Sequence, residues 1–169
     1  FSVVRYGNVV GSRGSVAPLF QRLLAKGVTE LPITDPRMTR FWITLNQGVD
    51  FVLSSFSLMR GGEIFVPKIP SMKMTDLAEA MAPGVPIKVI GIRPGEKLHE
   101  MMISVDDART TVDLGDRYAI EPAFVEYPRE SYAGTRPLAP EGFSYASDTN
   151  TEWLSGPGLL ELLNDPAPG

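Results

Sequence analysis

The sequence predicts an α/β fold with a sizeable core and no repeat architecture, and one observation supports each of these three statements. Short segments rich in Val, Ile and Phe alternate with segments in which apolar residues recur at helical spacing. The chain has 169 residues and 43% hydrophobic content, which supplies the apolar area for a sizeable core. It contains no internal repeat and no low-complexity tract. Antiparallel pairing of the same segments would make the class α+β.

The first part of the chain predicts one strand, two helices and the segments between them. Phe1–Val4 has the composition of a strand, and residues 5–15 form a loop rich in Gly and Ser. Residues 16–26 predict a helix with Pro18 in its first turn, where the missing N–H of proline costs nothing. Residues 31–36 read as a short extended piece and a turn. Residues 43–59 predict an amphipathic helix with apolar residues at positions 45, 49, 52, 53 and 56.

The rest of the chain predicts further strands and short helices. Residues 63–67 and 87–92 have the composition of strands, and residues 74–81 that of a helix between them. Further along we expect a short helix at 98–102, strands at 109–113 and 117–121, and a last helix at 159–163. Between 122 and 147 the many Pro, Tyr, Glu and Gly residues predict loops that wrap the surface.

The composition argues against several classes of function. Sixteen Lys and Arg against 20 Asp and Glu give a net charge of −4, whereas a nucleic-acid binder needs a basic surface. No run of 18 apolar residues is present, so we expect no membrane span. The absence of Cys removes disulfides, thiolate metal sites and a Cys nucleophile. A single His, His99, disfavours a His-based metal cluster and a Ser-His-Asp triad.

A glycine pattern lies between the first strand and the first helix. Gly7, Gly11 and Gly14 stand where a dinucleotide fingerprint would, and Asp35 follows at about the spacing of a ribose-binding acid. Arg13 interrupts the close backbone approach that such a fingerprint needs. The alternative is a loop at the C-terminal end of a later strand, whose amides and Arg13 face a phosphate or amide of a bound cofactor.

Arginines near aromatic rings give a second candidate. Arg37 and Arg40 precede Phe41 and Trp42, so guanidinium groups could meet phosphates while the rings stack on a base or sugar. The alternative is a surface turn before a helix, with both rings in the core.

The segment Arg93-Pro94-Gly95-Glu96 is a more specific candidate, because it follows a predicted strand. Arg93 can bind a diphosphate through two hydrogen bonds, and Glu96 can accept hydrogen bonds from a ribose diol across the Pro-Gly turn. The alternative is a surface Arg–Glu ion pair, worth roughly 0–1 kcal/mol. For His99 we expect a structural role.

Four long motifs, in order, resemble those of one enzyme family. Residues 5–16, 33–42, 62–72 and 91–100 are similar to the inverting UDP-N-acetylglucosamine 4,6-dehydratases, extended short-chain dehydrogenase/reductases that begin pseudaminic acid synthesis. The resemblance implies the C-terminal part of an NAD(P)-binding Rossmann fold, with the last sheet strands and a small substrate-binding subdomain. Residues 1–169 would then form the UDP-sugar-binding part, and a Rossmann half that holds NADP would precede Phe1.

The resemblance also implies roles for individual residues. A loop along the nicotinamide end of NADP would consist of Val9, Val10, Gly11, Ser12 and Arg13. Contacts to UDP-N-acetylglucosamine or a related UDP-sugar would come from Asn8, Val16, Thr34, Arg93 and Glu96. Arg93 and Glu96 match the family's diphosphate and ribose partners. The family implies a homo-oligomer, and a nucleotide-sugar ligand implies the cytoplasm, with no nucleic-acid or membrane partner.

The catalytic residues of the family have no counterpart in this sequence. None of the five Tyr residues has Lys four positions later, so the Tyr-x-x-x-Lys pattern is absent and we expect no dehydratase activity from this chain alone. Within enzymes, a UDP-sugar epimerase or a capsule-type retaining dehydratase stays open. Outside catalysis, the alternatives are a silent nucleotide-sugar binding module and a purely structural domain.

Overall fold

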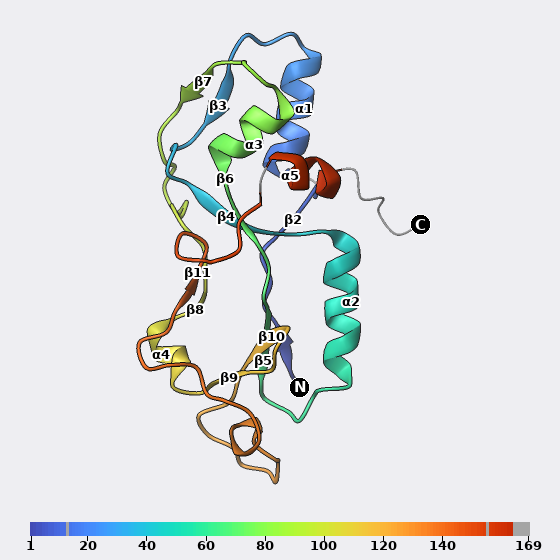
Figure 1. Ribbon diagram of the computed structural model, residues 1–169, viewed down its shortest axis with the longest axis vertical. Helices are drawn as coiled ribbons and strands as arrows, with labels where there is room; N and C mark the ends of the chain where they lie inside the picture. Colours follow the sequence, from blue (N-terminus) through green and yellow to red (C-terminus); the bar gives the residue numbers. More distant parts are fainter. Residues whose placement is uncertain (13, 155, 164–169) are drawn as a thin grey trace. The chain divides into compact units, whose positions relative to one another are not determined.

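The computed structural model describes residues 1–12, 14–154 and 156–163, which form two compact units (Figure 1). The first unit combines residues 1–6, 47–68 and 101–146, and the second combines the described residues of 7–46, 69–100 and 147–163. Strands and helices alternate in much of the chain, and both parallel and antiparallel strand pairs occur. The predicted α/β class is therefore confirmed.

The first unit is built on a four-stranded sheet with the order β1-β5-β10-β9. β1 (Val3–Val4) runs parallel to β5 (Ile64–Pro67), and β10 (Arg117–Ile120) runs antiparallel to both β5 and β9 (Thr111–Asp113). A separate pair joins β8 (Met101–Ile103) to β11 (Tyr145–Ala146). The predicted strands near 63–67, 109–113 and 117–121 are therefore present, each shortened at one end.

Helices complete the first unit. The helix α2 (Leu45–Phe56) contributes Phe51 to a core with Phe65, Val112, Ala119 and Tyr132. The short helix α4 (Val105–Ala108) starts at a capping box between Ser104 and Asp107. A 3-10 turn η1 covers Tyr132–Gly134.

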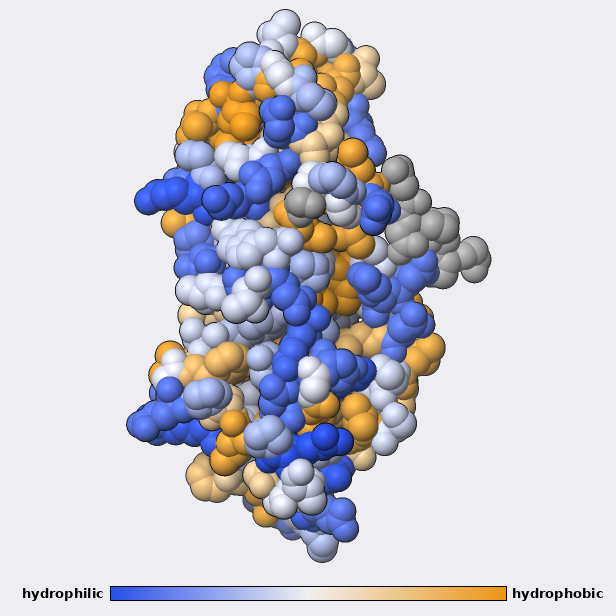
Figure 2. Space-filling model, viewed as in Figure 1, coloured by the Kyte–Doolittle hydropathy of each residue, from blue (hydrophilic) through white to orange (hydrophobic). Residues whose placement is uncertain are grey.

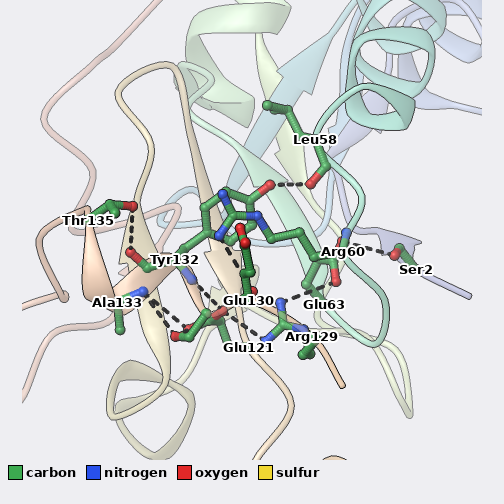
Figure 3. Close-up of polar contacts among 11 residues, drawn as sticks. Ser2, Leu58, Arg60, Glu63, Glu121, Arg129, Glu130, Tyr132, Ala133 and Thr135 are labelled. Carbon is green, nitrogen blue, oxygen red and sulfur yellow. Dashed lines mark hydrogen bonds and ion pairs between the residues drawn. The ribbon is translucent and has the colours of Figure 1, made fainter. Parts of the chain in front are cut away.

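A buried group of charged side chains ties the segment 121–133 to the sheet (Figure 3). The guanidinium of Arg129 donates to Glu121 Oε1 at 2.9 Å, and its Nη2 lies 3.6 Å from Glu63 Oε2. The side chain of Glu63 is 0% exposed and that of Arg129 is 6% exposed. Glu63 also accepts hydrogen bonds from the Ser2 hydroxyl and the Arg60 amide.

The carboxylate of Glu121 is surrounded by donors. It accepts from the Ser131 hydroxyl at 2.6 Å and from the Tyr132 amide at 2.9 Å. Burial alone would raise the pKa of Glu121, but these hydrogen bonds and the charge of Arg129 hold that pKa below its ordinary value. Glu121 is therefore a charged group that the fold keeps ionised inside the first unit.

The second unit combines two small sheets with three helices. β4 (Thr39–Ile43) lies between β2 (Asn8–Val9), to which it is parallel, and β6 (Ser71–Lys73), to which it is antiparallel. β3 (Leu31–Ile33) pairs in parallel with β7 (Ile87–Val89). Helix α3 (Met74–Met81) contacts both α1 (Val16–Ala25) and α5 (Gly156–Leu163) (Figure 1). Their shared core includes Phe20, Leu31, Trp42, Met72, Leu77 and Leu159.

Gly7, directly before β2, lies against the backbone of Phe41 in β4. A Cβ atom on Gly7 would lie 2.5 Å from the Cβ of Phe41 and 2.7 Å from its carbonyl oxygen. No side chain fits there without moving the backbone of β4. Gly7 therefore acts in strand packing.

Four expectations need correction. The predicted helix at 98–102 is wrong: the chain there extends into β8, because residues of β4 bind the carbonyl groups of Lys97 and Leu98 that a helix would use. The loop expected at 5–15 contains β2. The segment 122–147, expected as loops, contains η1 and β11. Finally, the helix predicted at 43–59 is shorter, since Ile43 belongs to β4 and α2 ends at Phe56, and it exposes Leu45, Val49, Leu53 and Phe56.

Candidate functional site

A pocket of about 240 Å³ lies within the second unit. Residues from β2, β3 and β4, from the start of α1 and α3, and from the segment after β7 enclose it. The lining residues are Asn8, Gly14, Ser15, Val16, Leu19, Pro32, Ile33, Thr34, Met38, Arg40, Trp42, Met74, Ile90, Arg93 and Glu96. Apolar side chains thus share one pocket with an amide, two guanidinium groups and a carboxylate.

All five residues predicted to contact a UDP-sugar line this pocket. They come from three distant parts of the sequence: Asn8 and Val16, then Thr34, then Arg93 and Glu96. The residues predicted to face NADP are not among the lining residues: Val9 and Val10 belong to β2 and the turn after it, and Gly11 and Ser12 are exposed. Arg13 lies outside the described residues.

A tight turn places Arg93 and Glu96 side by side. The amide of Glu96 donates to the Arg93 carbonyl at 3.0 Å, and Gly95 between them has φ +81°. Proline followed by a glycine of positive φ is the pattern of a type II turn. The sequence Pro94-Gly95 therefore creates the bend locally, as it also predicts.

The bend is fixed to Thr34 on the neighbouring strand end. Backbone bonds continue past the β3–β7 pair, from the Gly91 amide to the Thr34 carbonyl at 3.1 Å. The Thr34 hydroxyl donates to Glu96 Oε1 at 3.3 Å, and the Arg93 amide donates to Glu96 Oε2 at 3.2 Å. The Glu96 carboxylate is thereby oriented, while each of its oxygens can accept a further hydrogen bond.

The two arginines of the pocket differ in what they bind. Among the described residues, the guanidinium of Arg93 makes no hydrogen bond or ion pair, and the residue is exposed. The guanidinium of Arg40 donates to the carbonyls of Thr39, Leu98 and Lys97 and lies 3.5 Å from Glu100. Arg93 is therefore the pocket cation that is free to bind an anionic ligand.

The sequence analysis did not identify two buried polar groups that belong to residues lining the pocket. The Ser15 hydroxyl and the Trp42 indole N–H are buried and have no hydrogen-bond partner within the described part of the chain. Phe41 and Trp42 are 0% and 2% exposed, so both rings lie in the core as the alternative expected, but they belong to strand β4 and not to a surface turn. No sequence signal distinguished these two polar groups, since whether a buried polar atom finds a partner depends on contacts between residues far apart in the sequence.

The turn after β2 is the segment predicted to face a cofactor. The Val10 amide donates to the Ile43 carbonyl at 2.9 Å, and the Val10 side chain packs on the core of the second unit. Gly11, with φ +72°, then turns the chain outward, which leaves Gly11 and Ser12 accessible. For metals, no group of three His, Asp or Glu side chains with suitable geometry occurs in the described ranges.

Asp35, considered above as a ribose-binding acid, is engaged by Arg37. The Arg37 guanidinium donates two hydrogen bonds to its carboxylate, at 3.0 and 2.8 Å. The Arg37 side chain, with help from its backbone amide, lowers the pKa of Asp35 to about 2. Neither residue lines the pocket.

This ion pair predicts an acid-dependent loss of stability. Because the folded-state pKa is about 2 and the unfolded value is about 4, ionised Asp35 stabilises the folded state above pH 4, and the contribution disappears as the pH falls through 2. The free energies of unfolding of the parent chain and Asp35→Asn should therefore differ at neutral pH and converge in acid. A difference that stays constant from pH 7 to pH 2 would contradict this assignment.

Comparison with known proteins shows which family this chain belongs to. Residues 1–122 match the family described as polysaccharide biosynthesis protein. The chain is 56% identical, over 97% of its length, to an inverting UDP-N-acetylglucosamine 4,6-dehydratase of Campylobacter jejuni, of which it covers 51%. It is 45% identical, over 70% of its length, to a UDP-glucose 4-epimerase of Rickettsia canadensis, of which it covers 36%.

A solved structure agrees with these sequence relatives. The chain resembles the X-ray structure of Pen from Bacillus thuringiensis with a TM-score of 0.78 and 34% identity, over 96% of this chain and 49% of the other. The chain spans about half the length of the Campylobacter relatives that it matches. No helix in the described ranges has the length and hydrophobicity needed to cross a membrane. The resemblance stated from the four motifs is confirmed, and the chain belongs to the polysaccharide biosynthesis protein family.

Proposed function

We propose that this chain is the UDP-sugar-binding part of an inverting UDP-N-acetylglucosamine 4,6-dehydratase. The observation that carries the proposal is the pocket of the second unit, where Asn8, Val16, Thr34, Arg93 and Glu96 meet. The guanidinium of Arg93, which has no hydrogen bond or ion pair within the described part of the chain, suits a diphosphate, and the oriented carboxylate of Glu96 suits the adjacent ribose diol. The 56% identity to an enzyme of that name supports the choice of substrate.

The proposed reaction needs a cofactor, and we propose NADP. When bound, NADP would supply the hydride chemistry: a hydride would leave C4 of the sugar as the C4 hydroxyl loses its proton, water would be lost across C5–C6, and the hydride would add to C6 while a proton adds to C5 with inversion. In this chain the turn of Val9, Val10, Gly11 and Ser12 would face the nicotinamide end, together with Arg13. The exposure of Gly11 and Ser12 supports this placement because a ligand can reach them.

We further propose that a Rossmann half carries most of the cofactor site and packs on the first unit. In support, α2 exposes Val49, Leu53 and Phe56 at 41%, 59% and 63%, and the edge strand β1 exposes Val3 at 55%. Hydrophobic surface is visible over the region of α2 in Figure 2. Apolar side chains gathered on one helix face are typical of a surface that another element covers. Assembly into a homo-oligomer, a place in pseudaminic acid synthesis and a cytoplasmic reaction complete the proposal.

A UDP-sugar epimerase is the second candidate, because a curated epimerase shares 45% identity with this chain. That similarity covers 70% of the chain, against 97% for the dehydratase, and the identity is lower. The dehydratase is therefore the function that we propose.

Catalytic activity of the isolated chain is the first test. With UDP-N-acetylglucosamine and added NADP, we expect no 4-keto sugar, since none of the five Tyr residues has Lys four positions later to serve as the proton-transfer pair. The same assay on the Campylobacter jejuni relative is the positive control. Clear turnover by this chain alone would contradict the proposal that this part binds the UDP-sugar and lacks the catalytic residues.

Ligand binding by the isolated chain is the second test. Calorimetric titration with UDP and with UDP-N-acetylglucosamine should show saturable binding, because the pocket residues all belong to one compact unit. A purely structural domain would bind neither ligand.

A further inference from the structure

Two residues of β4 hold the segment that follows the Arg93–Glu96 bend, one through its backbone amide and one through its side chain. The Thr39 amide donates to the Leu98 carbonyl at 3.2 Å, and Arg40 donates to the same carbonyl at 3.1 Å and to that of Lys97 at 2.8 Å. The Nε of Arg40 lies 3.5 Å from Glu100 Oε1. Two consecutive residues of β4 thus bind three residues of the segment 97–100.

A chain of hydroxyl groups extends the same attachment to His99. Thr39 Oγ1 lies 2.8 Å from His99 Nδ1 and 2.7 Å from Ser147 Oγ. The Glu100 amide donates to Ser147 Oγ at 2.9 Å, and the Ser147 amide donates to the Glu100 carbonyl at 2.8 Å. Thr39 is 3% exposed and Ser147 is 0% exposed, so water cannot replace a lost partner. The other ring nitrogen of His99 faces Asp148 at 4.0 Å.

The bend is therefore attached on both sides. Before it, the Ile90 amide donates to the Ile33 carbonyl at 2.9 Å and continues the β3–β7 ladder. After it, β4 binds the chain through Thr39 and Arg40. Between these anchors, Arg93 is exposed, and its hydrogen bonds among the described residues are made only by its backbone. Its location relative to the pocket depends on where the two anchors hold the turn.

We propose that Thr39, acting through His99, is a positioning residue for the UDP-binding bend. The assignment rests on the proposed function, in which Arg93 and Glu96 bind UDP. Thr39 does not line the pocket, so it can influence the ligand only through the segment that it holds. Arg40 shares this task but also lines the pocket, and for that reason its substitution would mix two effects.

The test pairs each disruptive variant with a conservative one. Thr39→Val removes the hydroxyl, whereas Thr39→Ser retains it. His99→Leu removes the ring nitrogen that lies beside the Thr39 hydroxyl, whereas His99→Asn keeps a polar atom near the place of Nδ1. For each variant, amide hydrogen exchange across residues 87–100 is measured without ligand, and UDP affinity is measured by calorimetry.

We expect Thr39→Val and His99→Leu to speed exchange at residues 93–100 but not at 87–91, and to weaken UDP binding about threefold to tenfold. Thr39→Ser and His99→Asn should show the exchange rates at residues 93–100 and the UDP affinity of the parent chain. Combined with Arg93→Ala, Thr39→Val should add less than its separate effect, because both act on one contact.

Failure of this proposal and failure of the proposed function give different results. Unchanged exchange at 93–100 in Thr39→Val, or unchanged UDP affinity with altered exchange, overturns the positioning role. Absence of UDP binding by the parent chain itself overturns the proposed function, and with it the role assigned to Thr39. If Thr39→Val does not fold, the amide exchange and the UDP affinity of His99→Leu and His99→Asn test the proposal instead.

Discussion

Arg129→Ala is expected to lower the free energy of unfolding by about 3–5 kcal/mol at neutral pH, because it removes one partner of a buried ion group. The side chains of Glu63 and Glu121 are 0% and 9% exposed, and both would remain buried without their cation. Denaturant titration of the parent and variant gives the difference. Since protonation neutralises carboxylates, the loss should shrink as the solution is acidified.

An exposed arginine of the same unit provides the matched control. Arg109, whose side chain is 82% exposed, lies 4.0 Å from Asp106. Arg109→Ala also removes one positive charge, yet we expect a change of only about 0–1 kcal/mol. Equal unfolding midpoints for the two variants would show that the buried group contributes no more than a surface pair. Arg129→Lys should fall between them, since Lys keeps the charge but loses the fork that reaches two carboxylates.

The sequence predicts those parts of the molecule that local chemistry decides. The Pro94-Gly95 bend follows from the fixed φ of proline and the positive φ open to glycine, and α1 and α3 follow from their apolar spacing. The resemblance of the four motifs to the family predicted that Asn8, Thr34 and Arg93 belong to one site, and these residues do line one pocket.

Other features depend on contacts between distant residues. Arg40 and Arg93 are the same residue type. Among the described residues the Arg93 guanidinium has no hydrogen bond or ion pair, whereas Arg40 binds the Thr39 carbonyl, lies near Glu100 and is held by the carbonyls of Lys97 and Leu98. The same carbonyls explain why residues 98–102 do not form a helix. In α2, periodicity identifies the apolar positions but not their partner, and Phe51 rather than Leu53 faces the core of the first unit. Glu63 and Arg129 are 66 positions apart, beyond the reach of any local pattern.

Arg93→Ala is expected to weaken UDP binding by about 1.5–3 kcal/mol, which corresponds to roughly tenfold to 150-fold in Kd. The reason is that the Arg93 guanidinium, which has no other partner among the described residues, would lose charged hydrogen bonds to the diphosphate. Calorimetric titration of parent and variant measures the change. Arg22→Ala is the control, because Arg22 lies at the end of α1 in the same unit, is exposed and does not line the pocket.

The choice of ligand separates the two halves of the bend. Uridine carries the ribose but no diphosphate, so Arg93→Ala should weaken UDP binding and leave uridine binding nearly unchanged. Glu96→Gln should weaken both ligands, and by less than Arg93→Ala weakens UDP, because one acceptor oxygen remains on the side chain. Added salt should reduce the parent's affinity for UDP more than that of Arg93→Ala, since Arg93 is exposed to screening ions. Equal losses for UDP and uridine in Arg93→Ala would place the guanidinium away from the diphosphate and refute the orientation proposed for the ligand.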